Sequence, residues 1–329
     1  MANKFIVATA PHMHSPMSTQ SLMRDVLIAL VPAFAVSLVV CGVDALRVMA
    51  IAVASCVAVE YLIQKFLFGG KQTVSNLSAV VTGVLLAFNL PANIAWWIVV
   101  VGAVVAIGVA KMTFGGLGRN PFNPALVGRV FLLIAYPVQM TSFPKPVSAN
   151  YIDAFAGATP LAALKSKAIA AGDANLLDMF AGMMPGSMGE IAAAALLVGG
   201  IYMIWRKVIT WHIPVAVLGS MALFAFVVAL AQGGVSALLY ELPAFHLLAG
   251  GAMLGAIFMA TDYVTSPMTH KGQLIYGFGI GLITCVIRLW GAYPEGMSFA
   301  ILIMNAATPL INNYVKPTRF GAKEKGGKK

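Results

Sequence analysis

The chain has 329 residues, of which 60% are hydrophobic and only 10% are charged, and its mean hydropathy is +0.88. Soluble domains carry about 25% charged residues, so this composition excludes a soluble globular protein and indicates an integral membrane protein. The net charge of +10 requires no nucleic acid partner. Part of it lies in the basic tail at 323–329, which we expect to meet anionic lipid or a partner protein.

Ten apolar runs along the chain are each long enough to cross about 30 Å of hydrocarbon, which takes about 20 residues. The first run follows Arg24 and Asp25, too far into the chain for a cleaved signal peptide. We therefore predict an all-α polytopic membrane protein with about ten transmembrane helices. The predicted helices are 26–43, 48–66, 76–90, 95–113, 122–140, 188–205, 212–231, 245–261, 273–290 and 297–315.

Lysine and arginine are distributed unequally between the two sides that ten spans would define. One side holds fifteen of the 21 basic residues and the other five, while Arg129 lies within a predicted span. Because basic loops are retained in the cytoplasm, we expect both termini to be cytoplasmic and the long central loop to face the periplasm or the exterior. The predicted organisation is a cytoplasmic segment 1–25, a first five-helix repeat 26–140, an extracytoplasmic loop 141–187, a second five-helix repeat 188–315 and a basic cytoplasmic tail 316–329.

The two predicted halves resemble each other in the order of their elements. The third run of each half is short and closes on polar residues and proline, at 82–91 in the first half and 255–267 in the second. The fifth runs also match in part, at 123–126 and 305–310. Because each half has an odd number of spans, the halves must be inverted relative to each other. Broken helices in inverted repeats are where transporters bind ions or cofactors.

Three polar residues near these breaks, Asp262, Asn89 and Asn123, are candidates for ion or charge coupling. An ionised carboxylate at bilayer depth costs about 2.5–3.5 kcal/mol, so Asp262 would be a functional residue if it lies inside the membrane. A small shift of the span boundary would instead place it at the cytoplasmic surface, where it would only cap the next turn. Glu60 and Arg129 are the other charges that lie well inside predicted spans, away from the span ends, and we expect each to be paired or to snorkel.

The cysteines, histidines and glycines suggest no metal or nucleotide site. Cys41, Cys56 and Cys285 are scattered among the predicted spans without Cys-x-x-Cys spacing, which excludes an iron–sulfur cluster held by this chain alone. Each is better interpreted as a small buried hydrophobe. The glycine patterns at 251–255 and 277–281 lie inside apolar spans, where they are typical of helix-packing surfaces.

A soluble-looking segment between the fifth and sixth predicted spans presents one threonine, Thr159. Gly157 and Ala158 leave the approach to it nearly free of side-chain bulk, and Pro160 fixes φ at about −65°, which suits the first turn of a helix. The Thr159 hydroxyl would then be an ordinary helix N-cap worth about 1 kcal/mol. A phosphate attached at the same place would meet backbone N–H groups without partners and the positive end of the helix dipole. The two interpretations are compatible.

The segment from Asp153 to Thr159 resembles the flavinylation motif of the RnfD/NqrB family, Asp-x-x-(Ser/Ala/Thr)-Gly-Ala-Thr, whose last threonine carries FMN through a phosphoester. Asp153, Gly157, Ala158 and Thr159 match the required positions. Ala156 stands where many members have serine, so any hydrogen bond made by that hydroxyl is missing here.

The resemblance covers nearly the whole chain. It includes the stretches 11–16, 21–30, 115–125, 260–262 and 293–297. The short N-terminal segment and Pro137-Val138-Gln139-Met140-Thr141-Ser142 are closer to RnfD than to NqrB, which usually has a longer N-terminal extension. Tyr263 departs from the family pattern, because relatives often have proline after Ala-Thr-Asp.

The resemblance implies an electron-relay subunit of the Rnf complex, an ion-translocating ferredoxin:NAD⁺ oxidoreductase of prokaryotic inner membranes, that is not catalytic alone. It implies FMN held covalently on Thr159 at the outer face and a second, non-covalent riboflavin within the membrane part. The implied partners are the A, B, C, E and G-type subunits of the complex and a flavin transferase that attaches the FMN. Coupled Na⁺ or H⁺ transport would work against about 2.3 kcal/mol per charge per 100 mV.

Two alternatives remain open from the residues. One is the NqrB-like subunit of the Na⁺-translocating NADH:quinone oxidoreductase, which would add a quinone site. The other is a flavin-free channel or solute transporter, in which Thr159 is only a helix cap and the repeat conducts a small molecule. The presence of flavin separates the second alternative from the redox proteins.

Overall fold

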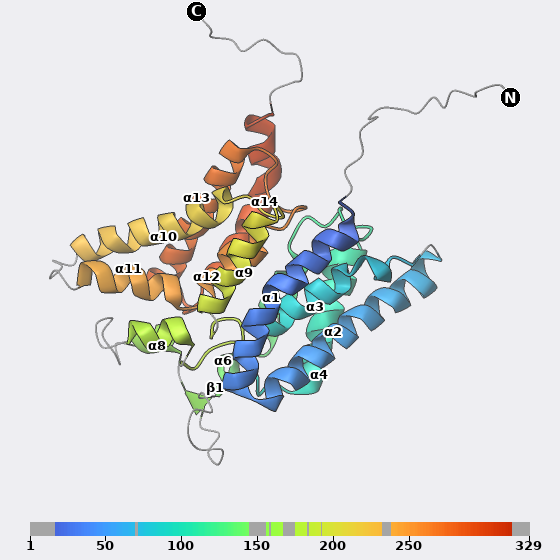
Figure 1. The fold of residues 1–329 in the computed structure, drawn as a ribbon, viewed down its shortest axis with the longest axis horizontal. Coiled ribbons are helices and arrows are strands. Elements are labelled where there is room, and N and C mark those ends of the chain that lie inside the picture. The colour runs from blue at the N-terminus through green and yellow to red at the C-terminus, as the bar shows by residue number, and fades with distance from the viewer. Residues whose placement is uncertain are drawn as a thin grey trace, which may run out of the picture.

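The computed structural model describes residues 17–69, 72–144, 156–157, 159–166, 175–182, 184–191, 193–231 and 238–317 (Figure 1). Two residues of the predicted flavin motif, Asp153 and Ala158, lie outside these ranges, as do the basic tail beyond residue 317 and most of the N-terminal segment. The regular secondary structure of the described chain is helical, apart from a ladder of two strands with two residues each. The prediction of an all-α membrane protein is confirmed.

Each of the ten intervals predicted to span the membrane contains helix. In the first half these are α1 (Thr19–Cys41), α2 (Val43–Ile63) with η1 (Gln64–Phe68), α3 (Ser78–Phe88), α4 (Trp96–Ala103) with η3 (Val104–Met112), and α5 (Pro124–Ala135) with α6 (Pro137–Thr141). In the second half they are α9 (Ala193–Trp205), α10 (His212–Ala231), α11 (Leu238–Leu248) with α12 (Ala252–Leu254) and η5 (Gly255–Met259), α13 (His270–Trp290) and α14 (Met297–Tyr314). Between the halves lie α7 (Pro160–Lys165) and α8 (Leu176–Ala181), and the 3₁₀ turn η2 (Val74–Asn76) precedes α3.

Within the described residues, four helices are long and apolar enough to cross a membrane: α1, α2 continued through Phe68, α10 and α13. A fifth candidate span is bent by 65° between Leu248 and Ala252. The sequence predicts a broken helix in this element, but at its polar and proline end, whereas the break lies at Gly250 and Gly251, with φ +66° and +64° in a conformation that glycine adopts readily. The prediction that Gly251 belongs to a helix-packing surface is therefore wrong, because it lies in this turn. The other apolar helices are shorter, so the count of ten spans and the inversion of the halves remain predictions.

Local sequence explains where several helices begin and end. The side chains of Ser18 and Ser21 form a reciprocal capping box at the start of α1, and Gly42 at φ +65° turns the chain into α2. Asn123 caps α5 with Pro124 in the first helical turn. The predicted helix 122–140 is wrong as one continuous span, because Tyr136 leaves the helical conformation before Pro137. The α-helical conformation is sterically disfavoured for a residue that precedes proline, which accounts for this break.

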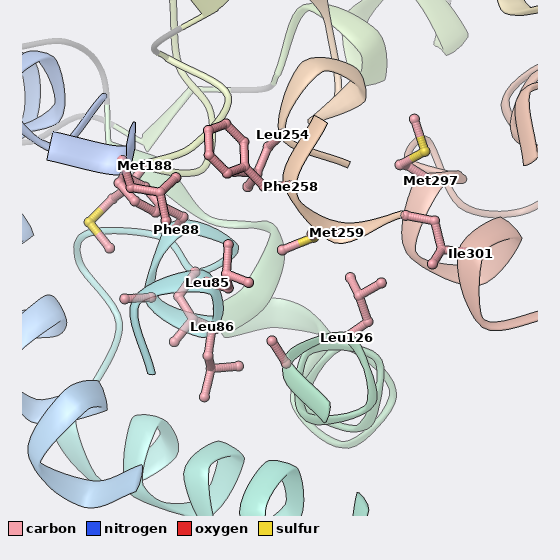
Figure 2. Close-up of a cluster of buried hydrophobic side chains, with 14 of the residues drawn as sticks. Leu85, Leu86, Phe88, Leu126, Met188, Leu254, Phe258, Met259, Met297 and Ile301 are labelled. Atoms are coloured by element: carbon pink, nitrogen blue, oxygen red, sulfur yellow. The ribbon is translucent and has the colours of Figure 1, made fainter. Parts of the chain in front are cut away.

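The second helix of each half packs against the third and fourth helices of the same half. In the first half, α2 contacts α3, α4 and η3, and in the second half α10 contacts α11 and α13. Helices α1 and α9 lie side by side where the halves meet (Figure 1). Figure 2 shows the core between the halves, where Leu85, Phe88 and Leu126 lie opposite Phe258 and Ile301. The short third elements of both halves, α3 and α12 with η5, therefore end in the buried centre of the protein.

Three segments of the described chain are π-helical rather than α-helical: η1, η3 and η5. Their wider turns are seen in the bonds from the Thr113 amide to the Gly108 carbonyl and from the Ala260 amide to the Gly255 carbonyl. Such segments occur frequently at functional sites. Each of the three carries a residue of the buried polar networks described below.

The glycine pattern in α13 is a helix-packing surface, as the sequence predicts. A Cβ on Gly281 would lie 1.9 Å from the Ser220 Oγ and 2.6 Å from the Val217 carbonyl oxygen of α10. A Cβ on Gly277 would lie 2.7 Å from the Cβ of Ala216. The backbones of α10 and α13 approach closely because these positions lack side chains.

Replacing Gly281 with alanine is expected to destabilise the protein by about 1–3 kcal/mol, because the added methyl group overpacks this interface. Gly219→Ala in α10 is the matched control, since its Cβ would have no neighbour within 4 Å and alanine favours the helix. Thermal unfolding in detergent would compare the two variants. Equal stability of Gly281→Ala and Gly219→Ala would contradict the proposed packing.

Candidate functional site

Thr159 is the N-cap of α7, as the sequence predicts. Its backbone is extended (φ −62°, ψ 151°), and its Oγ1 accepts a hydrogen bond from the Ala162 amide at 3.2 Å, with Pro160 in the first turn. The residue is 5% exposed. Strand β2 (Ala156–Gly157) precedes it and pairs antiparallel with β1 (Phe143–Pro144), with Gly157 opposite Phe143. This ladder ties the chain before Thr159 to the end of the first half.

The other end of α7 is tied to the second half of the protein. Lys165 donates hydrogen bonds to the carbonyl oxygens of Gly291 and Tyr293, the latter at 2.9 Å. Burial lowers the pKa of the Lys165 ammonium group. Leu161 packs in a small apolar cluster with Met179 and Phe245. Both halves thus fix the position of α7 and of its cap Thr159.

Thr159 lies at the wall of a cavity of about 130 Å³ that residues of both halves line. The residues lining it are Arg129, Leu133, Met140, Thr141, Phe143, Thr159, Ala162, Tyr293, Pro294 and Glu295. Most of this wall is apolar or aromatic, with threonine hydroxyls and two opposite charges as polar groups. A cavity with these properties is typical of a small-molecule or cofactor site.

Arg129 is the centre of a buried polar network next to this cavity. Its Nη1 donates to the Asn89 Oδ1 at 2.8 Å and to the Ser298 Oγ at 2.7 Å, and its Nη2 donates to Glu295. A second carboxylate, that of Glu190, has its Oε1 4.0 Å from the same Nη2. The expectation that Arg129 is paired is confirmed, although the sequence did not indicate with which residues.

The candidates Asn89 and Asn123 meet at the π-helical segment η5. The Asn89 Nδ2 donates to the Leu85 carbonyl at 2.6 Å and lies 3.6 Å from the Met259 Sδ. The Asn123 Nδ2 donates to the Met259 carbonyl at 3.1 Å, while its Oδ1 caps α5. Two residues from the first half are therefore joined through Met259 of the second.

The third candidate, Asp262, lies in the turn after η5 and is half-buried. Its Oδ2 accepts from the Thr265 hydroxyl at 3.2 Å and its Oδ1 from the Val264 amide at 3.5 Å, so it does cap the following turn. It also lines a second cavity, of about 80 Å³, whose polar lining includes Thr82, Asn120 and Asn123. Asp262 and Asn123 therefore share a cavity.

A buried ion pair that sequence reasoning missed lies beside this second cavity. The Lys111 Nζ is 2.6 Å from the Glu60 Oε2 and donates to the Ser78 hydroxyl at 2.8 Å, and the two charged side chains are 2% and 1% exposed. Gln64 donates to the other oxygen of Glu60 at 3.3 Å. Lys111 belongs to η3 and lines the cavity, although it is one of the fifteen basic residues that the sequence assigns to the cytoplasmic side. The expectation that Glu60 is paired is confirmed.

Arg288 is a second missed residue. It is 4% exposed, and its guanidinium donates to the carbonyl oxygens of His246, Ala249 and Gly250 at 2.6, 2.8 and 3.0 Å. These carbonyls are at the bend between α11 and α12, where the helix leaves its last carbonyls without internal partners. The arginine stabilises the broken helix. The sequence shows a basic residue near the end of this predicted span, but it does not show that its side chain points into the protein.

Comparison with known proteins gives the same family over nearly the whole chain. The family model described as NQR2, RnfD, RnfE family matches residues 6–321. The chain is 49% identical over 320 residues to the D subunit of the Na⁺-translocating ferredoxin:NAD⁺ oxidoreductase complex of Acetobacterium woodii, which covers 96% of this chain and 95% of the relative. It is 40% identical over 332 residues to the D subunit of the proton-translocating ferredoxin:NAD⁺ oxidoreductase complex of Clostridium ljungdahlii, covering 98% and 97%.

A third relative is the D subunit of the ion-translocating oxidoreductase complex of Vibrio cholerae, 37% identical over 352 residues that cover 96% of this chain and 99% of the relative. By their names, these relatives are subunits of complexes that translocate ions with an oxidoreductase reaction. The apolar helices agree with a multi-pass membrane protein. The chain therefore belongs to the NQR2, RnfD, RnfE family.

Proposed function

We propose that this chain is the D subunit of an Rnf-type ferredoxin:NAD⁺ oxidoreductase complex and that it relays electrons through FMN bound to Thr159 by a phosphoester. The observation that carries the proposal is the position of Thr159, a motif-matching threonine at the wall of a cavity that residues of both halves line. The relatives, each named as the D subunit of such a complex, support the assignment to the complex.

The residues around Thr159 fit a flavin phosphate and ring. In the described part of the chain the Thr159 Oγ1 accepts one hydrogen bond, and its proton has no protein acceptor. The Nε of Arg129, which lines the same cavity, is buried without a partner among the described residues. Phe143 and Tyr293 supply apolar and aromatic wall. A polar ligand at Thr159 would find both a donor and a flat apolar surface.

Each of these groups would have a distinct task. The flavin, when bound, supplies the capacity to accept and release electrons. Thr159 fixes it to the chain, while the β1–β2 ladder and Lys165 fix Thr159 between the halves. Arg129 places a positive charge where negative charge develops, and the apolar wall limits water. Asp153 and Ala158, outside the described residues, remain proposed members of the attachment motif.

A second, non-covalent riboflavin is proposed for the cavity between α3, α5 and η5. Asn120, Asn123 and Thr82 line it with hydrogen-bonding groups, and Phe258 and Leu85 line it with apolar surface. Few polar groups in an apolar pocket are typical of a site that orients an aromatic ligand. Asp262, Asn89 and Asn123 are the proposed residues for coupling to Na⁺ or H⁺ transport.

The proposed setting is the inner membrane of a prokaryote, with both termini cytoplasmic and the Thr159 segment on the outer side. Other subunits of the complex are the expected partners, together with a flavin transferase and membrane lipid. The observation behind this orientation is the unequal distribution of lysine and arginine between the two sides.

In-gel fluorescence of the denatured protein, co-expressed with its flavin transferase, tests the attachment. We expect the wild type to fluoresce and Thr159→Val to lose the signal completely, because valine has no hydroxyl to carry the phosphoester. Thr141→Val is the matched control, since Thr141 lines the same cavity and its hydroxyl bonds only to helix carbonyls within its own turn. It should keep the full signal.

Fluorescence that persists in Thr159→Val, or that is absent from properly exported wild type, would overturn covalent attachment at this residue. Absence would instead favour the flavin-free transporter. The same preparations test the second flavin: denaturation of Thr159→Val should release riboflavin in roughly equimolar amount, as measured by chromatography. A protein that releases none would contradict the riboflavin site.

A further inference from the structure

Four charged side chains, three of them buried and one half-buried, lie together at the end of the Thr159 cavity, on elements that are far apart in the sequence. They are Arg129 of α5, Arg288 of α13, Glu190 in the turn before α9, and Glu295 in the segment before α14. The side chains of Arg129, Glu190 and Glu295 are 6%, 2% and 12% exposed. Arg129 and Glu295 line the cavity, and Glu190 lies behind them.

The two carboxylates share one guanidinium group. Nη2 of Arg129 contacts Glu295 and lies 4.0 Å from the Glu190 Oε1, so both carboxyl groups are close to the same nitrogen. Arg288 adds a positive charge nearby, but its Nη atoms are committed to the carbonyls at the α11–α12 bend. Glu190 thus has a neighbour of like charge and only a distant ionic partner.

Unpartnered polar atoms gather in the same place. Within the described chain, six buried side-chain atoms lack a hydrogen-bond partner. Five of them are the Glu190 Oε1, the Nε atoms of Arg129 and Arg288, and both ring nitrogens of His246, which is 2% exposed and whose carbonyl binds Arg288. A buried acceptor without a hydrogen-bond partner costs free energy. We therefore expect this region to hold a proton or a water molecule in addition to the protein atoms.

Two carboxyl groups this close do not both ionise readily. When like charges share a buried site, the pair binds a proton that belongs to both groups rather than to one. The charged and titratable groups that face the pair are Arg129, Arg288 and His246, with Lys165 and Tyr293 on the neighbouring elements. Arg129 and Arg288 favour ionised carboxylates, whereas the repulsion between the two carboxylates opposes the ionisation of both. One added charge nearby would therefore decide whether the pair binds a proton.

We propose that Glu190 and Glu295 are a proton-binding pair that takes up one proton when an electron reaches the flavin on Thr159 and releases it when the electron leaves. The inference rests on the proposed function, which provides that flavin and a reduced one-electron carrier as donor. The electron adds one negative charge to the cavity. A proton from the outer aqueous phase leaves its water carrier and forms one O–H bond on the carboxyl pair, so the net charge of the buried region is unchanged.

Infrared spectroscopy of the assembled complex tests this assignment directly. In the reduced-minus-oxidised difference spectrum we expect a carbonyl band of a protonated carboxylic acid that shifts in D₂O. The band should be lost in Glu190→Gln and in Glu295→Gln, and it should return at a shifted frequency in Glu190→Asp. Asp178→Asn is the control, because Asp178 of α8 is an exposed carboxylate in the segment that contains Thr159, and it should leave the band unchanged.

A second arm separates this inference from the proposed function. The variant Thr159→Val, which lacks the covalent FMN, should still show one acid band that appears as the pH is lowered and that is lost with either glutamine substitution, since the pair exists without that FMN. A band that survives both Glu190→Gln and Glu295→Gln, in folded complex, would overturn the pair. A pH-titrating pair whose band does not respond to reduction of a covalently flavinylated complex would overturn its coupling to the flavin. Absence of gel fluorescence from the wild type would overturn the proposed function instead.

Discussion

Replacing Arg129 with methionine is expected to destabilise the protein by about 3–5 kcal/mol, because it leaves buried carboxylates without their cation. Arg129 contacts Glu295, Asn89 and Ser298, which lie on three separate elements. Methionine fills much of the same space but donates no hydrogen bond, so all of these acceptors would lose a partner. Thermal and denaturant unfolding in detergent, followed by tryptophan fluorescence, would measure the loss.

The control for Arg129 is Arg47→Met. Arg47 pairs with Asp44 at 3.3 Å, but the two side chains are 49% and 57% exposed, so their separation should cost no more than about 1 kcal/mol. Arg129→Lys should fall between the two variants, since one ammonium group keeps the charge but cannot reach all three partners. If Arg129→Met were no less stable than Arg47→Met, the network would not have the structural role described for it.

Lys111→Met should destabilise the protein by a similar amount, about 3–5 kcal/mol, because the Glu60 carboxylate stays buried and keeps only Gln64 as a side-chain donor. Adding Glu60→Gln to this variant removes the uncompensated charge. The double variant Glu60→Gln/Lys111→Met should therefore be more stable than Lys111→Met alone. A double-mutant cycle on the free energy of unfolding would give the coupling between the two residues.

The single variants Lys111→Met and Glu60→Gln need not be equally unstable, but their effects on the free energy of unfolding should not add. Additive losses would mean that Glu60 and Lys111 stabilise the protein independently, against the 2.6 Å contact between them. Ser78→Ala is a useful comparison, because it removes the neutral acceptor of Lys111 and leaves the ion pair in place. Its cost should be about 1 kcal/mol.

Features encoded by neighbouring residues could be predicted from the sequence. The Thr159-Pro160 pair contains all that an N-cap requires, and the structure has the cap at that residue. The positions of the apolar helices follow from runs of hydrophobic residues, and the close contact at Gly277 and Gly281 follows from their spacing on one helix. Pro137 marks the break at Tyr136 in the sequence. The break was nevertheless missed, because the apolar run continues through it and is long enough for a complete span.

Features that depend on distant residues could not be predicted in this way. Arg129 and Glu295 are 166 positions apart, and no local pattern indicates that they meet. Glu190 and Arg288 were missed because each lies near the end of an apolar run, where a charge is ordinarily exposed to water or headgroups. Their burial follows from the packing of broken helices from both halves, which leaves carbonyls and carboxylates in the interior.

The π-helical turns at η1, η3 and η5 allow a kind of adjustment that a regular α-helix does not. A π turn holds one residue more than an α turn, and exchanging its i→i+5 bond for an i→i+4 bond would pass that extra residue along the helix. Each such step rotates the following side chains by about 100° and advances them by about 1.5 Å. In η5 a single step would turn Met259 away from Asn89, while the helix ends stay in place. Side chains at the centre of the protein could thus change partners by a shift of register, without any movement of whole helices through the bilayer.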